Sequence, residues 1–205
     1  VAAFLVSVPP ARAHIKKIIV DQKVSPAFDG RSFGDAGQYE TLAGRAFGEL
    51  DPNDPHNAII TDIRLAQRNA NGKVEYVASF FLVKPIDMSK SSHLMWHDVP
   101  NRGGRVTIVV EERKFGDVGL SSGWQGDNSG NTAPGQNNDY VTVPVAKNPD
   151  GSSISGQIIG RIMNASGVES RPMIGNSNPI PYKPFTLDTS KATLTTHASE
   201  TIEGV

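Results

Sequence analysis

The chain has 205 residues, a net charge of −1 at pH 7, 20 glycines, 14 prolines and no cysteine. The missing cysteines exclude disulfides, zinc–thiolate sites and cysteine nucleophiles. The balanced charge offers no basic surface, so we expect neither a nucleic-acid partner nor a membrane partner. Glycine and proline interrupt the apolar runs so often that many short strands and turns are favoured over long helices.

The first thirteen residues differ from the rest of the chain. Residues 1–8 are apolar, two prolines follow, and residues 11–13 read A-R-A, the A-x-A form of a signal-peptidase site. This pattern predicts that residues 1–13 are the remnant of a secretory signal peptide. The protein is therefore expected to be exported, to the periplasm or outside the cell. The alternative is a frayed apolar N-terminus.

Apolar alternation predicts short strands over residues 14–164. Asn71 and Gly72 form a strong hairpin signal, so residues 58–66 and 74–84 are expected to pair antiparallel around them. Gly44 and Gly48 interrupt a predicted strand and indicate a bulge or a close backbone approach. The other strands are predicted at residues 14–24, 39–50, 94–99, 106–110, 140–146 and 154–163.

The fold predicted from these strands is mainly β. We expect a short-stranded, antiparallel β-sandwich-like domain over residues 14–164, with about eight to ten strands. No convincing amphipathic helix of ten or more residues is evident. Residues 165–205 are interpreted as the Pro- and Gly-rich irregular tail of a truncated chain.

One catalytic motif occurs in the sequence. Residues 119–123 read G-L-S-S-G and match G-x-S-x-G, the nucleophile elbow, which needs a buried strand before the serine and a helix after it. Residues 111–117 are too polar for such a strand, and residues 124–138 hold too much Gly, Asn and Pro for a helix. We therefore interpret the match as chance and assign no catalytic residue.

A glycine-containing turn supplies the first group of candidate binding residues, Asn101, Arg102, Gly103 and Gly104. A glycine pair after a strand can bring backbone N–H groups close to an anion, as an oxyanion hole requires. The guanidinium of Arg102 can also clamp a substrate carboxylate. The alternative is an ordinary tight turn with a surface arginine.

The second group of candidate binding residues is Trp124, Gln125 and Asp127. The indole can stack on a ring of the ligand, while the amide and the carboxylate hydrogen-bond to it. The alternative is a tryptophan that fixes a loop to the core.

We expect no metal and no cofactor. His93 and His97 flank a strand-like segment, where residues four apart lie about 13 Å from each other, too far to share a metal. The oxygen-rich residues around Asp51 and Asp54 do not have the spacing of an EF-hand loop.

Six collinear segments carry a resemblance to a known family. They read SPAFDGRSFGDAGQYE (25–40), GELDPNDPHNAIITDI (48–63), NANGKVEY (69–76), DVPNRG (98–103), GWQGD (123–127) and VPVAKNPDG (143–151). In this order they resemble the N-terminal part of bacterial alpha/beta hydrolase domain-containing proteins, large exported serine-hydrolase-like proteins. The stretch between DVPNRG and GWQGD is shorter and more polar here than in that family.

The resemblance implies a longer parent protein with its catalytic triad beyond residue 205. This chain would then be the non-catalytic β-rich part of a serine ester hydrolase, inactive alone, that shapes the pocket for a small-molecule ester. The resemblance also raises the alternative that the chain includes the first strands of an α/β-hydrolase sheet. A different alternative is a stand-alone β-sandwich that binds a ligand or partner without catalysis.

Overall fold

The computed structural model of the chain describes residues 14–101, 104–105, 107–126, 139–157, 186–193 and 195. The predicted signal segment, residues 1–13, lies outside them. The chain divides into two compact units, with the described residues up to Ile154 in the first and those from Ser155 onward in the second. In the second unit the described residues form a 3₁₀ turn at Thr189–Lys191.

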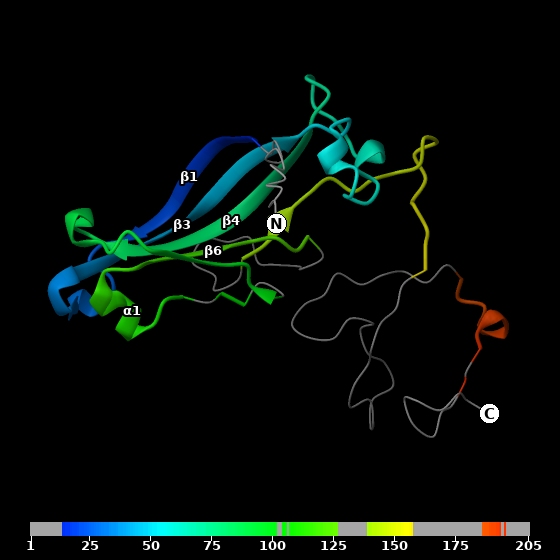
Figure 1. Ribbon diagram of the computed structural model, residues 1–205. Coiled ribbons are helices and arrows are strands. Elements are labelled where there is room, and N and C mark those ends of the chain that lie inside the picture. The colour runs from blue at the N-terminus through cyan, green and yellow to red at the C-terminus, as the bar shows by residue number, and fades with distance from the viewer. Residues whose placement is uncertain are drawn as a thin grey trace, which may run out of the picture. The chain divides into compact units, whose positions relative to one another are not determined.

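The first unit is built on one open sheet (Figure 1). Its elements, as far as the chain is described, are β1 (His14–Val24), β2 (Ser32–Phe33), β3 (Gly37–Leu50), β4 (Val74–Pro85), β5 (Met95–Asp98), α1 (Val110–Phe115), β6 (Val118–Ser122) and β7 (Val141–Thr142). The strand order is β1-β3-β4-β6-β5, with β2 beside β3 and β7 beside β4. β5 and β6 are parallel and the other pairs are antiparallel. The prediction of a mainly β fold is confirmed. The described residues form one mixed, largely antiparallel open sheet, and the predicted sandwich of two sheets is not seen among them.

The longest pair in the sheet is β3 with β4, whose register runs unbroken from Tyr39 opposite Pro85 to Leu50 opposite Val74. The predicted strand at residues 58–66 is therefore wrong, because β4 takes β3 as its partner instead. The intervening segment folds through two 3₁₀ turns, Pro55–Asn57 and Ile63–Leu65. A proline at the start of the first turn fixes its φ angle, and the preceding Asp54 caps it by accepting a hydrogen bond from the His56 N–H at 2.9 Å.

The close backbone approach predicted at Gly44 is confirmed, whereas at Gly48 the close neighbour is a side chain. A Cβ at Gly44 would lie 2.1 Å from the carbonyl oxygen of Ile19, and one at Gly48 would lie 2.3 Å from the Tyr76 ring. Neither position can therefore carry a side chain without displacing a neighbouring strand or ring.

Several of the shorter predicted strands are wrong. In place of a strand at 106–110, α1 begins at Val110: the Glu112 side chain accepts from the Val109 N–H, and Gly116 ends the helix at φ +84°. The strand predicted at 140–146 is reduced to β7. Residues 154–157 form no strand, and the remainder of the strand predicted at 154–163 lies outside the described residues.

The buried core lies on one face of the sheet. Its side chains come from the β2 region, β3, β4 and the segment before α1, namely Phe33, Ala36, Tyr39, Val83 and Ile108. The hydroxyl of the fully buried Tyr39 lies 2.9 Å from the carbonyl oxygen of Arg113 and 3.0 Å from that of Asp117, and its one hydrogen is shared between them. This contact fixes the end of α1 against the sheet.

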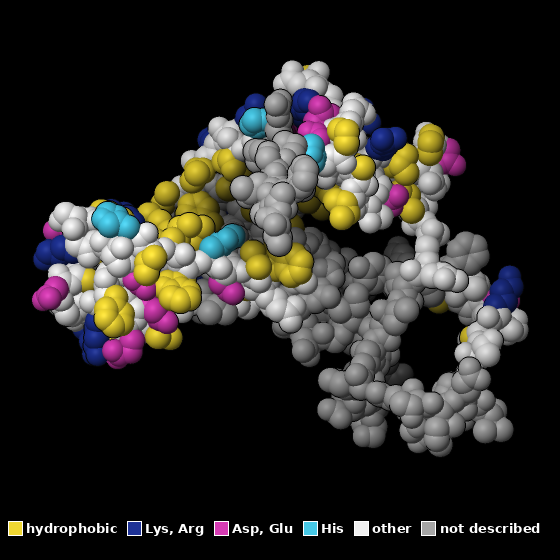
Figure 2. Space-filling model, viewed as in Figure 1, with side chains coloured by type: hydrophobic (Ala, Val, Ile, Leu, Met, Phe, Trp, Pro, Cys, Tyr) yellow, Lys and Arg dark blue, Asp and Glu magenta, His cyan; other side chains and the backbone are white. Residues whose placement is uncertain are grey.

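Large apolar side chains also remain exposed on β1. Ile15, Ile18 and Val20 are 50%, 64% and 49% exposed. Figure 2 shows hydrophobic side chains gathered on the surface over the strands of the sheet. The hydrophobic surface of the sheet is therefore only partly covered.

A buried carboxylate connects the first three long strands. Glu40 on β3 forms ion pairs with Lys23 of β1 at 2.7 Å and Lys84 of β4 at 2.8 Å. Burial raises the pKa of Glu40, but hydrogen bonds from Lys23, Lys84 and Ser25 outweigh it and lower the pKa to about 2.

Replacing Glu40 with glutamine should therefore destabilise the chain in a pH-dependent way. The folded pKa lies below the unfolded value, so the contribution of Glu40 is complete above the unfolded pKa and is lost as the pH falls from about 5 to about 2. We expect the free energy of unfolding to fall by about 2 kcal/mol at pH 7, a value reduced from the full pKa shift because Lys23 is half exposed. Urea unfolding of the wild type and the Glu40→Gln variant at pH 7 and pH 3 measures this difference. A stability difference that does not shrink at pH 3 would contradict this account.

Candidate functional site

The candidate site lies where the two parallel strands end. β5 and β6 pair from Met95 opposite Val118 to Asp98 opposite Ser121, and α1 lies between them in the sequence. Parallel strands present their carboxyl ends at one edge of a sheet, which is where α/β proteins place their ligands. The two predicted binding segments follow these ends, the 101–104 turn after β5 and residues 124–127 after β6.

The 101–104 turn is closed by its own backbone. The N–H of Gly104 donates to the carbonyl oxygen of Asn101 at 3.3 Å, and both residues are exposed. The Gly104 N–H is therefore engaged within the turn. Arg102 and Gly103, the other two predicted site residues of this turn, lie outside the described part of the chain.

The structure brings the predicted tryptophan to this turn. The Nε1 of Trp124 donates to the carbonyl oxygen of Pro100 at 2.9 Å, while the side chain as a whole stays 54% exposed. Gln125 accepts a hydrogen bond from the Val141 N–H at 3.4 Å through its backbone oxygen. Asp127 lies outside the described residues. An exposed indole beside the turn is thus available for stacking on a ligand.

Ser121, the serine of the G-x-S-x-G match, lies inside β6 and is 1% exposed. Its Oγ donates to Oδ2 of Asp139 at 2.5 Å. A nucleophile elbow instead presents its serine on a strained turn between a strand and a helix. Ser121 therefore does not have the geometry of a nucleophile elbow in this structure.

The neighbouring Ser122 makes a different contact. Its Oγ lies 2.8 Å from Nε2 of His97 on β5. A catalytic serine–histidine pair also needs a third group that orients the imidazole. Among the described residues no carboxylate bonds to His97, so within that part of the chain this pair is not completed to a triad.

Sequence reasoning missed a buried polar cluster beside the site. Asp139 has no exposed side-chain surface, and it accepts hydrogen bonds from Ser79 at 3.2 Å, Ser121 at 2.5 Å and Nη2 of Arg105 at 2.9 Å. The guanidinium of Arg105 also lies 4.3 Å from the centre of the Phe81 ring. Arg105 directly follows Gly104, so the cluster fixes one end of the turn while Trp124 fixes the other.

A small pocket of about 220 Å³ borders β5. It is lined by Trp96, His97, Asp98, Thr107, Ile108, Glu112, Gly119 and Leu120. The Oδ2 of Asp98 is buried and has no hydrogen-bond partner. A ligand with an N–H or O–H group would satisfy this oxygen.

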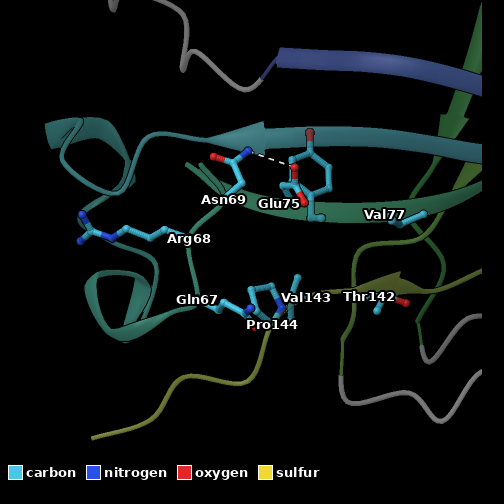
Figure 3. Close-up of a pocket in the computed structure, with 9 residues that line it drawn as sticks. Gln67, Arg68, Asn69, Glu75, Val77, Thr142, Val143 and Pro144 are labelled. Atoms are coloured by element: carbon cyan, nitrogen blue, oxygen red, sulfur yellow. Dashed lines mark hydrogen bonds between the residues drawn. The ribbon is translucent and has the colours of Figure 1, made fainter. Parts of the chain in front are cut away.

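A larger pocket of about 350 Å³ lies at the N-terminal end of β4 (Figure 3). It is lined by Gln67, Arg68, Asn69, Glu75, Tyr76, Val77, Thr142, Val143 and Pro144. Asn69 donates to Glu75 at 3.0 Å on one wall, and Figure 3 shows Gln67, Val143 and Pro144 gathered on another. Its volume suits a small organic molecule.

No group of three His, Asp or Glu side chains among the described residues is arranged to hold a metal ion. None of the described helices is long and apolar enough to span a membrane. No family model, curated protein or solved structure matches the chain.

Proposed function

We propose that the chain is the non-catalytic β-rich part of a serine ester hydrolase. It contains the first strands of the hydrolase sheet and shapes the pocket for a small-molecule ester, and the catalytic triad lies beyond residue 205. The proposal includes export, which rests on the A-R-A sequence at residues 11–13.

The observation that supports this function most directly is the position of the 101–104 turn. In α/β-hydrolases, one N–H of the oxyanion hole comes from the loop between a sheet strand and the first helix. Here the turn lies between β5 and α1, in a strand–helix–strand unit whose strands are parallel.

Ester hydrolysis tests this proposal. The 205-residue chain should not hydrolyse p-nitrophenyl acetate or butyrate above background. If the gene continues past Val205, its whole product should hydrolyse them, and a serine-directed inhibitor should stop the reaction. Replacing Ser121 or Ser122 with alanine in that product should leave the turnover per folded molecule unchanged.

The role of the 101–104 turn is tested in the whole gene product that hydrolyses the ester. Gly103→Pro removes one N–H donor and should lower kcat by roughly 10²- to 10³-fold with little change in KM. The control Gly104→Ala keeps its N–H and has room for the methyl group, whose nearest neighbour is the Asn101 oxygen at 3.7 Å. Turnover by the 205-residue chain that Ser122→Ala abolishes would overturn the proposal.

The 350 Å³ pocket beside β4 favours a second candidate function, a stand-alone β-sandwich-like module that binds a small molecule. Under this alternative the gene ends at Val205 and its product is stable and shows no hydrolysis. A small molecule that stabilises the wild-type chain thermally, but not a Val143→Arg variant with a blocked pocket, would favour it over the hydrolase.

A further inference from the structure

The loop that precedes β4 is a surface turn held by its own hydrogen bonds. The N–H of Gly72 donates to the carbonyl oxygen of Asn69 at 2.9 Å. The side-chain Oδ1 of Asn69 accepts from the N–H groups of Asn71 and Lys73, each at 3.0 Å. Gly72 has a φ of +71°, and no atom beyond its chain neighbours lies within 4 Å of the place where a Cβ would be. The space beside Gly72 is therefore open.

Asn71 combines an exposed side chain with a glycine as the next residue. Within the described part of the chain its side-chain amide makes no hydrogen bond, and only its backbone N–H is bonded. The Cγ of an asparagine and the backbone nitrogen of the following residue can close a five-membered ring. Glycine favours this closure, because it has no Cβ to obstruct the approach and its backbone adopts conformations that other residues avoid.

Three other asparagines of the first unit lack this combination. Asn57 is 4% exposed, and its Nδ2 donates to a backbone oxygen at 2.9 Å. The amide of Asn69 is bonded at both ends, since its Oδ1 accepts from two N–H groups and its Nδ2 donates to a carboxylate at 3.0 Å. Asn148 precedes Pro149, whose nitrogen has no hydrogen and cannot act as the nucleophile. Asn71 is thus the most reactive of the four.

We propose that Asn71 is a site of spontaneous deamidation. The Gly72 nitrogen, once its proton is lost to hydroxide, attacks the Cγ of Asn71. The bond from Cγ to the side-chain nitrogen breaks, and that nitrogen takes up a proton from water and leaves as ammonia. Water then opens the five-membered imide at one of its two carbonyl carbons and gives aspartate or isoaspartate. The net change consumes one water and releases one ammonia, with no oxidation or reduction. The proposal does not depend on the proposed function.

The turn allows this attack at small cost. The Gly72 N–H must first leave the Asn69 carbonyl oxygen, which breaks one hydrogen bond in a surface loop. Local opening of such a loop requires little free energy, so the folded chain should react within about tenfold of its rate in urea. A buried or fully bonded asparagine would instead have to wait for unfolding of the region around it.

Conversion of Asn71 changes the loop at the rim of the 350 Å³ pocket, which Arg68 and Asn69 line. Either product adds one negative charge to a chain whose net charge is −1. Isoaspartate also lengthens the backbone by one methylene group. This methylene lies between the N–H groups of residues 71 and 73, both of which Asn69 binds, so isoaspartate should loosen the loop.

Incubation of the 205-residue chain at pH 7 and pH 8, followed by peptide mapping with mass spectrometry, tests the proposal. The peptide that contains Asn71 should gain the mass of a deamidation, separate into an aspartate and an isoaspartate form, and react faster at pH 8. Its rate should exceed that of the peptides with Asn57 and Asn148 by at least about tenfold, because the first is buried and the second lacks a nucleophile.

Gly72→Asp should slow the reaction by at least about tenfold, because it adds a Cβ without a clash and aspartate tolerates a positive φ. Asn71→Gln should stop it, since glutamine would have to close a six-membered ring. Circular dichroism checks that each variant folds. A rate in the folded chain more than about tenfold below that in urea would overturn the proposal, because the turn would then protect Asn71. So would a Gly72→Asp variant that reacts as fast as the wild type.

Discussion

Replacing Gly123 with alanine is expected to destabilise the first unit by more than about 3 kcal/mol. A Cβ at this position would lie 1.9 Å from the carbonyl oxygen and 2.4 Å from the nitrogen of Tyr140. These are backbone atoms, so no side-chain rotation can relieve the overlap. The backbone is also held in place, because Ser79 accepts from the Gly123 N–H at 2.9 Å and donates its own N–H to Tyr140 at 2.9 Å.

Urea unfolding at pH 7, followed by circular dichroism, measures this effect. Gly104→Ala is the control: the nearest atom to its added methyl is 3.7 Å away, so its stability should stay within about 0.5 kcal/mol of the wild type. Equal stabilities of the two variants would contradict the close contact between Gly123 and the Tyr140 backbone.

Replacing Asp139 with asparagine should cost about 3–5 kcal/mol, because it leaves a buried guanidinium without its counter-charge. Arg105 is 8% exposed at its side chain and Asp139 is fully buried. Asparagine has nearly the same shape as aspartate, so the packing stays and the charge is lost. We expect the melting temperature to fall by on the order of 10 °C.

The matched control for this change is Asp150→Asn. Asp150 accepts a hydrogen bond from the Ser152 N–H at 2.9 Å on the surface, and its replacement should leave the melting temperature close to that of the wild type. Equal shifts for the two variants would contradict a stabilising role for the buried ion pair. A double variant that replaces Arg105 with methionine and Asp139 with leucine should recover part of the loss, because no buried charge then remains.

The existence of the long strands could be predicted from their apolar content, but the partner of β4 could not. Residues 74–84 were expected as a strand and form most of β4. Residues 58–66 alternate equally well, yet they form turns, because β3 pairs with β4 along its whole length and leaves this segment outside the sheet. Ile59 is therefore 89% exposed while Ile63 is 5% exposed. Alternation alone cannot show which of two candidate segments a strand will pair with.

The six-residue helix α1 could not be predicted, because it is too short for periodicity to be visible. It is held by tertiary contacts, among them the bond from Tyr39 to the Arg113 carbonyl oxygen, whose partners lie far apart in the sequence. The candidate site shows the same limit. Trp124 and the 101–104 turn were recognised separately, but the bond that joins Trp124 to Pro100 has no local signal, and neither does the pairing of Arg105 with Asp139.

The way β6 and β7 share one side of β4 bears on the order in which the chain folds. β6 pairs with Phe80 to Val83, β7 pairs with Val77 and Ala78, and the two strands meet at Ser79. β4 must form before β6 or β7 can pair with it. The loop between β6 and β7 must also close before both strands can pair, so this side of β4 is completed late in folding. Opening at Ser79 would also break the contacts of Asp139, which makes the junction a cooperative unit. Protection of the Ser79 amide from hydrogen exchange would then report the opening of this whole region rather than of one bond.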